Sequence, residues 1–264
     1  SPDGKQISFT SKIEGDFKLF TINYDGSNER KISDNALFPK WSPDGNKIAY
    51  QKGIFGKGKI YIFDIGNEKE INLTTDLQDS SNISWSPDSK NISFSSRIYG
   101  KNNIYILDID SKRLKKITDN NSDNSIPRWS PDGKKIAFTS KIKGNWDIFV
   151  IEINSLEINQ LTNFESDEVN LQWSPNGNKI LFESKKFDNK NDEIIVSIWV
   201  MSKDGKDLRK IIEGDISNPI WSPDGEWIYF NTDSEHNKIK VIKEDGSEIG
   251  TINSKDSFLS PKVF

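Results

Sequence analysis

Short segments in which apolar and polar residues alternate recur along the whole chain. Examples are residues 48–50 (IAY), 92–94 (ISF) and 136–138 (IAF). A period of two with isoleucine and aromatic residues is typical of β-strands. After a polar turn, each of these segments is followed by a denser apolar run such as residues 104–107 (IYIL). Runs that are apolar on both faces indicate strands packed between neighbouring sheets, and no window has a sustained helical period.

A turn motif, Trp-Ser-Pro-Asp-Gly, divides these strand patterns into six units. Its copies lie at residues 1–4 (without the Trp), 41–45, 85–89 (WSPDS), 129–133, 173–177 (WSPNG) and 221–225. Successive motif serines are separated by 41, 44, 44, 44 and 48 residues. Each unit holds four predicted strands, and that strand count and period match a blade of a β-propeller. We therefore predict an all-β fold, a six-bladed β-propeller of four-stranded antiparallel blades.

The motif residues are well suited to reversing the chain. Proline presets φ, aspartate can bond its local backbone, and glycine accepts a positive φ. We assign a structural turn role to Pro2, Asp3, Pro43, Asp44, Pro87, Asp88, Pro131, Asp132, Pro175, Asn176, Pro223 and Asp224. We assign packing between blades to Trp41, Trp85, Trp129, Trp173 and Trp221. The alternatives are a ring of catalytic aspartates and a stacking platform for bases or sugars.

The two ends of the chain predict how the propeller closes. Residues 257–264 (SFLSPKVF) resemble the segments before the motif tryptophans, such as 37–41 (LFPKW), and the first copy of the motif lacks such a segment. Pairing of this last strand with blade 1 would remove the exposed sheet edges. The predicted single domain spans residues 1–264, with blade 1 at 1–34 plus 257–264, then 35–78, 79–122, 123–166, 167–214 and 215–256.

Composition narrows the function classes. The 264 residues include no cysteine and one histidine, which excludes disulfide scaffolds, cysteine-bound zinc and thiol catalysis. Lysine and arginine total 36 against 40 aspartates and glutamates, so no basic field favours nucleic acid. No apolar run approaches the roughly 20 residues of a membrane-spanning helix. Because the chain starts at Ser1, we expect a processed or shortened chain whose targeting segment is not in view.

The repeated motif, followed by KKIAFTS at residues 134–140 and by G-x-x-x-I-[YF]-[VI] segments, resembles the propeller repeat of the TolB family. This resemblance implies a six-bladed propeller, a protein partner and a periplasmic, cell-surface or extracellular location. The repeat also resembles the propellers of prolyl-oligopeptidase-type peptidases and of oligogalacturonate lyases. Those enzymes need a G-x-S-x-G elbow or a histidine-rich metal site, and this chain has neither. We therefore expect no enzymatic activity.

Acidic residues precede the predicted first strand of each blade. Because first strands line the centre of a propeller, these residues are candidates for one mouth of its channel. The candidates are Asp34, Asp79, Asp123, Asp167, Glu168, Asp215 and Asp256. One interpretation is a binding site for a basic peptide end or for a hard cation such as Ca²⁺, the one cofactor considered. The other is that loops favour aspartate for turn formation. His236 is interpreted as a solvated turn residue, with a general base or metal ligand as the alternative.

The leading functional hypothesis is a monomeric, non-catalytic propeller that binds a protein or peptide in the cell envelope or outside the cell. A carbohydrate-binding or glycan-cleaving propeller is the alternative, and it predicts exposed aromatic residues near acidic groups. The residues that test it lie outside the motif: Tyr99, Trp146, Trp199 and Trp227. A third hypothesis is the sensor ectodomain of a larger protein. The ligand, the binding face and any metal are not specified by the sequence.

Overall fold

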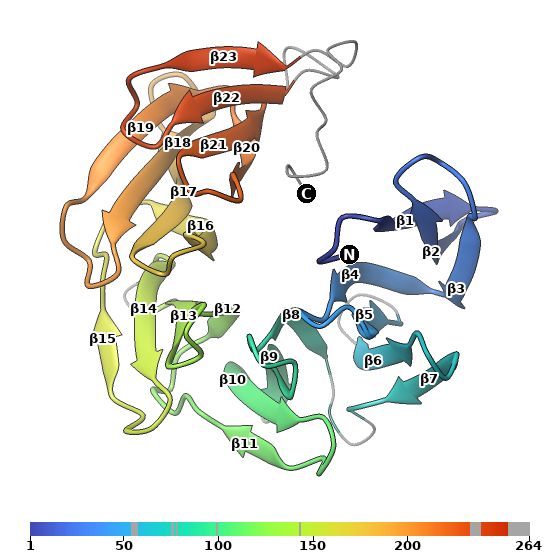
Figure 1. The fold of residues 1–264 in the computed structure, drawn as a ribbon. Helices are drawn as coiled ribbons and strands as arrows, with labels where there is room; N and C mark the ends of the chain where they lie inside the picture. The colour runs from blue at the N-terminus through green and yellow to red at the C-terminus, as the bar shows by residue number, and fades with distance from the viewer. Residues whose placement is uncertain are drawn as a thin grey trace. The chain divides into compact units, whose positions relative to one another are not determined.

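The computed structural model describes residues 1–53, 58–74, 77, 79–98, 100–142, 144–232 and 239–252 (Figure 1). Within these ranges the chain forms 23 β-strands and no α-helix, which confirms the all-β prediction. In the same ranges there is consequently no helix of the length and apolarity needed to cross a membrane.

The strands form six antiparallel sheets, each built from strands that are consecutive in the chain. The first sheet contains β1 (Gln6–Ile13), β2 (Asp16–Asn23) and β3 (Arg30–Asp34). The second contains β4 (Ala36–Trp41), β5 (Lys47–Lys52), β6 (Lys59–Asp64) and β7 (Lys69–Asn72). The third contains β8 (Ser80–Trp85), β9 (Asn91–Ile98), β10 (Lys101–Asp108) and β11 (Leu114–Lys116). The last three contain β12 (Asn124–Trp129), β13 (Lys135–Ser140), β14 (Asp147–Glu152) and β15 (Ile158–Gln160); β16 (Asp167–Trp173), β17 (Lys179–Asp188), β18 (Glu193–Ser202) and β19 (Arg209–Gly214); and β20 (Ser217–Trp221), β21 (Trp227–Asn231), β22 (Ile239–Lys243) and β23 (Ile249–Ile252).

These six sheets confirm the prediction of six blades. Five sheets have four strands, and the first has three among the described residues. The strand that we predict to complete it, at residues 257–264, lies outside the described residues. The chain divides into two compact units between Trp129 and Ser130, and each is treated separately below.

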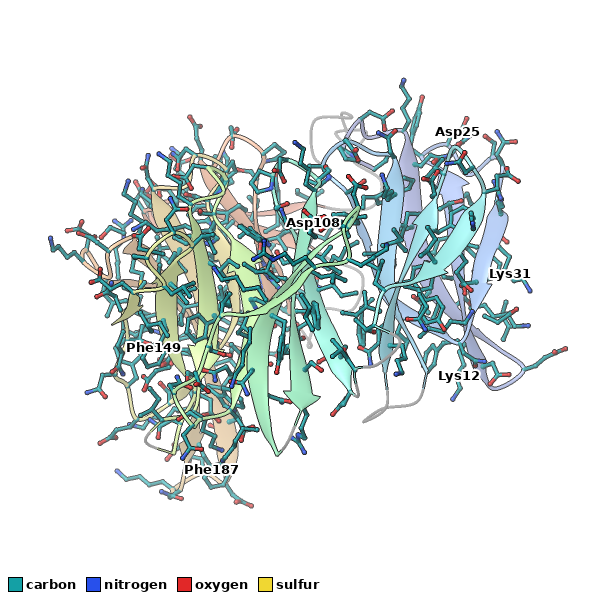
Figure 2. All side chains as sticks on the ribbon, turned by 90° about the horizontal axis from the view of Figure 1, so that it is seen from below. Lys12, Asp25, Lys31, Asp108, Phe149 and Phe187 are labelled. Atoms are coloured by element: carbon teal, nitrogen blue, oxygen red, sulfur yellow. The ribbon has the colours of Figure 1, made fainter. Side chains whose placement is uncertain are left out.

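The hydrophobic core of each unit lies between neighbouring sheets. In the unit of residues 1–129, Leu19 and Tyr50 belong to a cluster between the first and second sheets, and a larger cluster follows between the second and third. In the unit that starts at Ser130, Leu181 and Phe230 belong to a cluster between the fifth and sixth sheets. The dense apolar runs are therefore covered on both faces, as their composition predicts. Figure 2 shows how side chains fill the space between the sheets.

Aromatic pairs join two neighbouring strands in each of four sheets. The paired rings lie directly opposite each other in the strand register and stack with centroids 5.5–6.2 Å apart. The pairs are Phe9–Phe20, Tyr50–Tyr61, Phe94–Tyr105 and Phe138–Phe149. Each such pair contributes about 0.5–1.5 kcal/mol beyond the area that it buries.

The motif turns share one hydrogen-bond pattern. In the fourth sheet, the Ser130 hydroxyl donates to the Asp132 carboxylate at 2.6 Å and accepts from the Lys135 amide at 3.0 Å. Asp132 also accepts from the Lys134 amide, so its carboxylate closes the turn from inside. Asn176 accepts the equivalent bond from Ser174 at 2.8 Å through its amide oxygen. The aspartates of this motif are thus used in folding the turn.

Candidate functional site

A β-bulge interrupts the first strand of the second, third, fifth and sixth sheets. The strand register shifts between Leu37 and Lys40 in β4, and the shift recurs at the same place in β8, β16 and β20. One non-glycine residue in each of the five first strands from β4 to β20 has a positive φ of 51–57°: Phe38, Asn82, Ile126, Asn170 and Asn218. These residues recur at the spacing of the motif serines. A bulge bends its strand and redirects the side chains beside it.

Positive φ is unfavourable for the bulky Phe38 and the β-branched Ile126. A proline follows both residues, and proline is tolerated within sheets mainly at edges and bulges. The prolines at positions 39 and 219 were therefore the available sequence signal for the bulges in β4 and β20, which the strand pattern alone does not predict. Because strain of this kind persists only where the surroundings impose it, the first strands are the places to look for a site.

A cavity of about 370 Å³ lies among the first strands of the unit of residues 1–129. We call it the β4–β8–β12 cavity, after the strands that supply most of its lining. Its lining residues are Phe38, Lys40, Gln51, Asp79, Ser81, Asn82, Ile83 and Arg128. Figure 1 shows β4, β8 and β12 at one edge of their sheets, with β7 and β11 at the opposite edge of theirs. The cavity size is at the lower end of the range for ligand sites.

Two cations line this cavity from its two outer strands. Lys40 and Arg128 occupy the same repeat position, directly before the motif tryptophans of β4 and β12. Burial lowers the pKa of Arg128 to about 10. Burial also lowers the pKa of Lys40, and the charge of Arg128 lowers it further. The Lys40 residue is nevertheless exposed and lines the cavity, so a ligand can reach it.

Hydrogen bonds fix the polar wall of the cavity. The Asn82 amide donates to the Ser95 hydroxyl at 3.1 Å and to the Ser125 hydroxyl at 3.0 Å, which links β8 to β9 and β12. The Trp85 indole donates to the Lys40 carbonyl oxygen at 2.9 Å and holds the backbone of β4. The cavity wall is therefore ordered by contacts within the protein itself.

Phe38 gives the cavity an apolar surface. Its side chain is 56% exposed, although it lies in the middle of a strand. The bulge at Phe38 accounts for this exposure, since the side chain is turned out of the regular alternation. The cavity thus combines cations, amide and hydroxyl groups, and one exposed aromatic ring.

Two of the predicted acidic residues contact the preceding sheet. The Asp123 carboxylate accepts from the backbone N–H of Asn102 at 3.0 Å and lies 3.6 Å from the Lys101 ammonium. The Asp167 carboxylate accepts from the Trp146 amide at 2.9 Å. Each therefore joins the start of a first strand to the hairpin between the second and third strands of the sheet before it. This architectural bond gives a physical reason for aspartate at that position without any ligand.

Glu168 lies in the interior of the second unit and is fully buried. It accepts from the Ser166 hydroxyl at 2.8 Å and the Thr162 hydroxyl at 3.2 Å. Burial is the main cause that raises the pKa of Glu168 to about 8, and the charge of the buried Asp147 adds to it. Two buried carboxylates at one place do not both ionise readily, and this favours the protonated form of Glu168.

The remaining acidic candidates are dispersed. Asp34 is exposed and pairs with Lys31 at 3.0 Å, and Asp215 is exposed two residues before the start of β20. Asp79 is half-buried and lines the β4–β8–β12 cavity. Asp256 and His236 lie outside the described residues. Across the described ranges no group of three or more histidine or acidic side chains could hold a metal ion.

A second hollow lies in the unit that starts at Ser130. This groove of about 340 Å³ is lined by β17–β19 and the segment before β16. The half-buried Trp199 packs against Phe164 with ring centroids 5.3 Å apart, and Glu165 and Glu213 lie in the same lining. Of the other aromatic residues chosen to test glycan binding, Trp146 and Trp227 are half-buried and Tyr99 lies outside the described residues.

Comparisons with known proteins place these features in a family. The family model of the TolB beta propeller domain matches residues 14–261. The protein TolB homolog of Chlorobium luteolum is 33% identical over 64 residues, which are 23% of this chain and 15% of that relative. TolB from Acinetobacter baumannii has the same fold, with a TM-score of 0.71 and 23% identity over 97% of this chain. This chain covers 65% of that structure, less than two thirds of its length.

The same fold occurs in an enzyme. The oligogalacturonate lyase of Vibrio parahaemolyticus matches with a TM-score of 0.74 over 96% of this chain and 75% of its own, at 10% identity. At this identity the likeness concerns the fold alone. The fold by itself therefore does not separate binding propellers from catalytic ones, and the side chains must do so.

Proposed function

Because the chain belongs to the TolB β-propeller domain family, we propose that it is a non-catalytic domain that binds a peptide segment of a partner protein in the β4–β8–β12 cavity. The observation that carries the proposal is the lining of this cavity. Charged, amide and hydroxyl groups lie beside an exposed Phe38 within about 370 Å³. Convergent polar groups around an apolar surface are typical of ligand sites.

The motif aspartates support a binding role over catalysis. Catalysis by carboxylates needs groups that are free to exchange protons with a substrate. The motif carboxylates instead accept hydrogen bonds from their own turns, as Asp44 does from Ser42 and Asp132 does from Ser130. Their pKa values are lowered, which suits permanent acceptors and not general acids. The proposal includes a location in the cell envelope or outside the cell, as the TolB resemblance implies.

Selection from a displayed library of random heptapeptides tests this function. The library is selected on the purified chain alone, and the enriched peptides are then measured against Phe38→Ser, which removes the exposed ring. We expect peptides that bind the unaltered chain and lose most of their affinity for the variant. Enriched peptides that bind Phe38→Ser equally well would contradict binding in this cavity.

A second candidate function, glycan binding, rests on the groove at Trp199. The half-buried Trp199 ring beside carboxylates meets part of the arrangement that the carbohydrate hypothesis predicts, in which the ring is exposed. Titration of the chain with neutral and acidic oligosaccharides, followed by tryptophan fluorescence, tests it against Trp199→Leu. Saturable binding that this variant loses would support the groove. Binding that persists in Trp199→Leu, or no binding at all, would refute it.

A further inference from the structure

The charges of the β4–β8–β12 cavity are separated along its strands. Lys40 and Arg128 lie near the ends of β4 and β12, one residue before the last residue of each strand. Asp79 lies one residue before the start of β8. Because β8 is the repeat equivalent of both outer strands, Asp79 lies five positions before Ser84, which is at the level of Lys40 and Arg128. The cavity therefore has a positive and a negative end.

The middle strand leaves room at the positive end. At the repeat position of Lys40 and Arg128, β8 carries the short side chain of Ser84. The Ser84 hydroxyl is directed to the neighbouring strand, where it accepts from the Trp129 amide at 3.4 Å. Two long cationic side chains thus flank a strand that places no bulky group between them.

The positive charges of Lys40 and Arg128 favour the binding of an anion in the cavity. Within the described part of the chain, the Lys40 ammonium forms no ion pair or hydrogen bond. The charge of Arg128 lowers the pKa of Lys40, so the two cations act on each other through the cavity. An arriving carboxylate would relieve this repulsion and form charge-assisted hydrogen bonds, which are about twice as strong as neutral ones.

We propose that Lys40 and Arg128 form a carboxylate-binding pair that holds the acidic side chain or the C-terminal carboxylate of a bound peptide. The inference rests on the proposed function and adds the chemical class and direction of the ligand. The carboxylate lies at the Lys40 end, an apolar side chain packs on Phe38, and the opposite end of the segment points toward Asp79. A peptide fits this lining better than a free small anion, because Phe38, Asn82 and Gln51 offer contacts that an isolated anion does not use.

The heptapeptides enriched on the unaltered chain test the pair. Each is measured by fluorescence anisotropy against Lys40→Gln, Arg128→Gln and the matched control Lys115→Gln, an exposed cation of β11 in the same unit. We expect acidic peptides whose affinity falls about tenfold in each of the first two variants and stays unchanged in the control. Arg128→Lys should recover part of the loss, and higher salt should weaken binding to the unaltered chain more than to the variants.

Further measurements show which carboxylate of the peptide is bound and which of the two proposals a negative result contradicts. Peptides resynthesised as C-terminal amides, or with glutamate replaced by glutamine, show which carboxylate is held. Competition by free glutarate as effective as that by the peptide would overturn the peptide assignment. Neutral peptides that need Phe38 but bind the Lys40 and Arg128 variants unchanged would overturn the pair and leave the proposed function intact. The absence of any enriched peptide would contradict both.

Discussion

The Trp85 indole Nε1 donates a hydrogen bond to the Lys40 carbonyl oxygen at 2.9 Å. The third sheet thereby holds the backbone of the second at the residue that supplies a cation to the β4–β8–β12 cavity. A motif tryptophan that packs between sheets also positions the cavity wall. This one hydrogen bond therefore contributes both to the packing between sheets and to the candidate site.

Replacement of Trp85 by phenylalanine tests this connection. We expect a loss of about 1–2 kcal/mol in the free energy of unfolding, because the Lys40 carbonyl loses its partner in addition to the lost packing. Trp41→Phe is the matched control, since the Trp41 indole has no hydrogen-bond partner in the described part of the chain. Urea unfolding of both variants measures the difference. Equal losses would show that the indole bond contributes nothing measurable.

Because Glu168 is buried, we predict that the stability of the fold decreases as the pH rises toward 8. Its pKa is raised to about 8 in the folded chain, above the value near 4.3 of an unperturbed glutamate. The contribution of this raised pKa to the free energy of unfolding is therefore fully present below about pH 4 and is lost as the pH rises through 8. Glu168→Gln keeps a neutral hydrogen-bonding group, so the melting temperature of this variant should fall less between pH 6 and 9 than that of the unaltered chain. Parallel melting curves would contradict the raised pKa.

The two forms of the motif turn predict unequal effects at Asp132. Asn176 makes the equivalent bond in the fifth sheet, so Asp132→Asn should change the free energy of unfolding by only a few tenths of a kcal/mol. Asp132→Ala removes the acceptor for Ser130 and for the Lys134 amide and should cost about 1 kcal/mol. Thermal unfolding at pH 7 measures both. A costly Asp132→Asn would indicate that the negative charge itself matters.

Alanine substitutions at two turn glycines can distinguish the cost of backbone strain from the cost of a steric clash. Gly26 and Gly205 have nearly the same positive φ, +84° and +80°. An added Cβ would lie in open space at Gly26 but 3.2 Å from the Leu161 carbonyl oxygen at Gly205. Both alanine variants should lose about 1–2 kcal/mol from strain, and Gly205→Ala should lose about 1 kcal/mol more from the clash. Denaturant unfolding with equal losses would show that the backbone at Leu161 yields freely.

Much of the fold could be predicted because each unit repeats the same local signals. The alternation at residues 48–50, the apolar run at 104–107 and the proline–aspartate turns all specify strands and their ends. Agreement between such levels is what makes a fold predictable from sequence. The bulge at Phe38 and the positive φ of Ile126 were missed, because a strand pattern does not show a shift of register and the prolines that follow these residues were not used as a signal.

The candidate site was harder to predict for a related reason. The sequence analysis chose acidic residues by their place before the first strands, yet Asp123 and Asp167 bond to neighbouring backbone and Glu168 is buried. Lys40 and Arg128 became visible only when β4 and β12 were placed around one cavity. A cation before each of two motif tryptophans, 88 residues apart, could have drawn attention to them.

Hydrogen–deuterium exchange with and without an enriched heptapeptide tests the central claim most directly. The account predicts slower exchange in the presence of peptide at residues 36–41, 79–85 and 124–129, which supply most of the lining of the β4–β8–β12 cavity. Exchange at residues 195–213, around the Trp199 groove, should stay the same. Protection confined to that groove, with the three first strands unchanged, would contradict binding in the cavity.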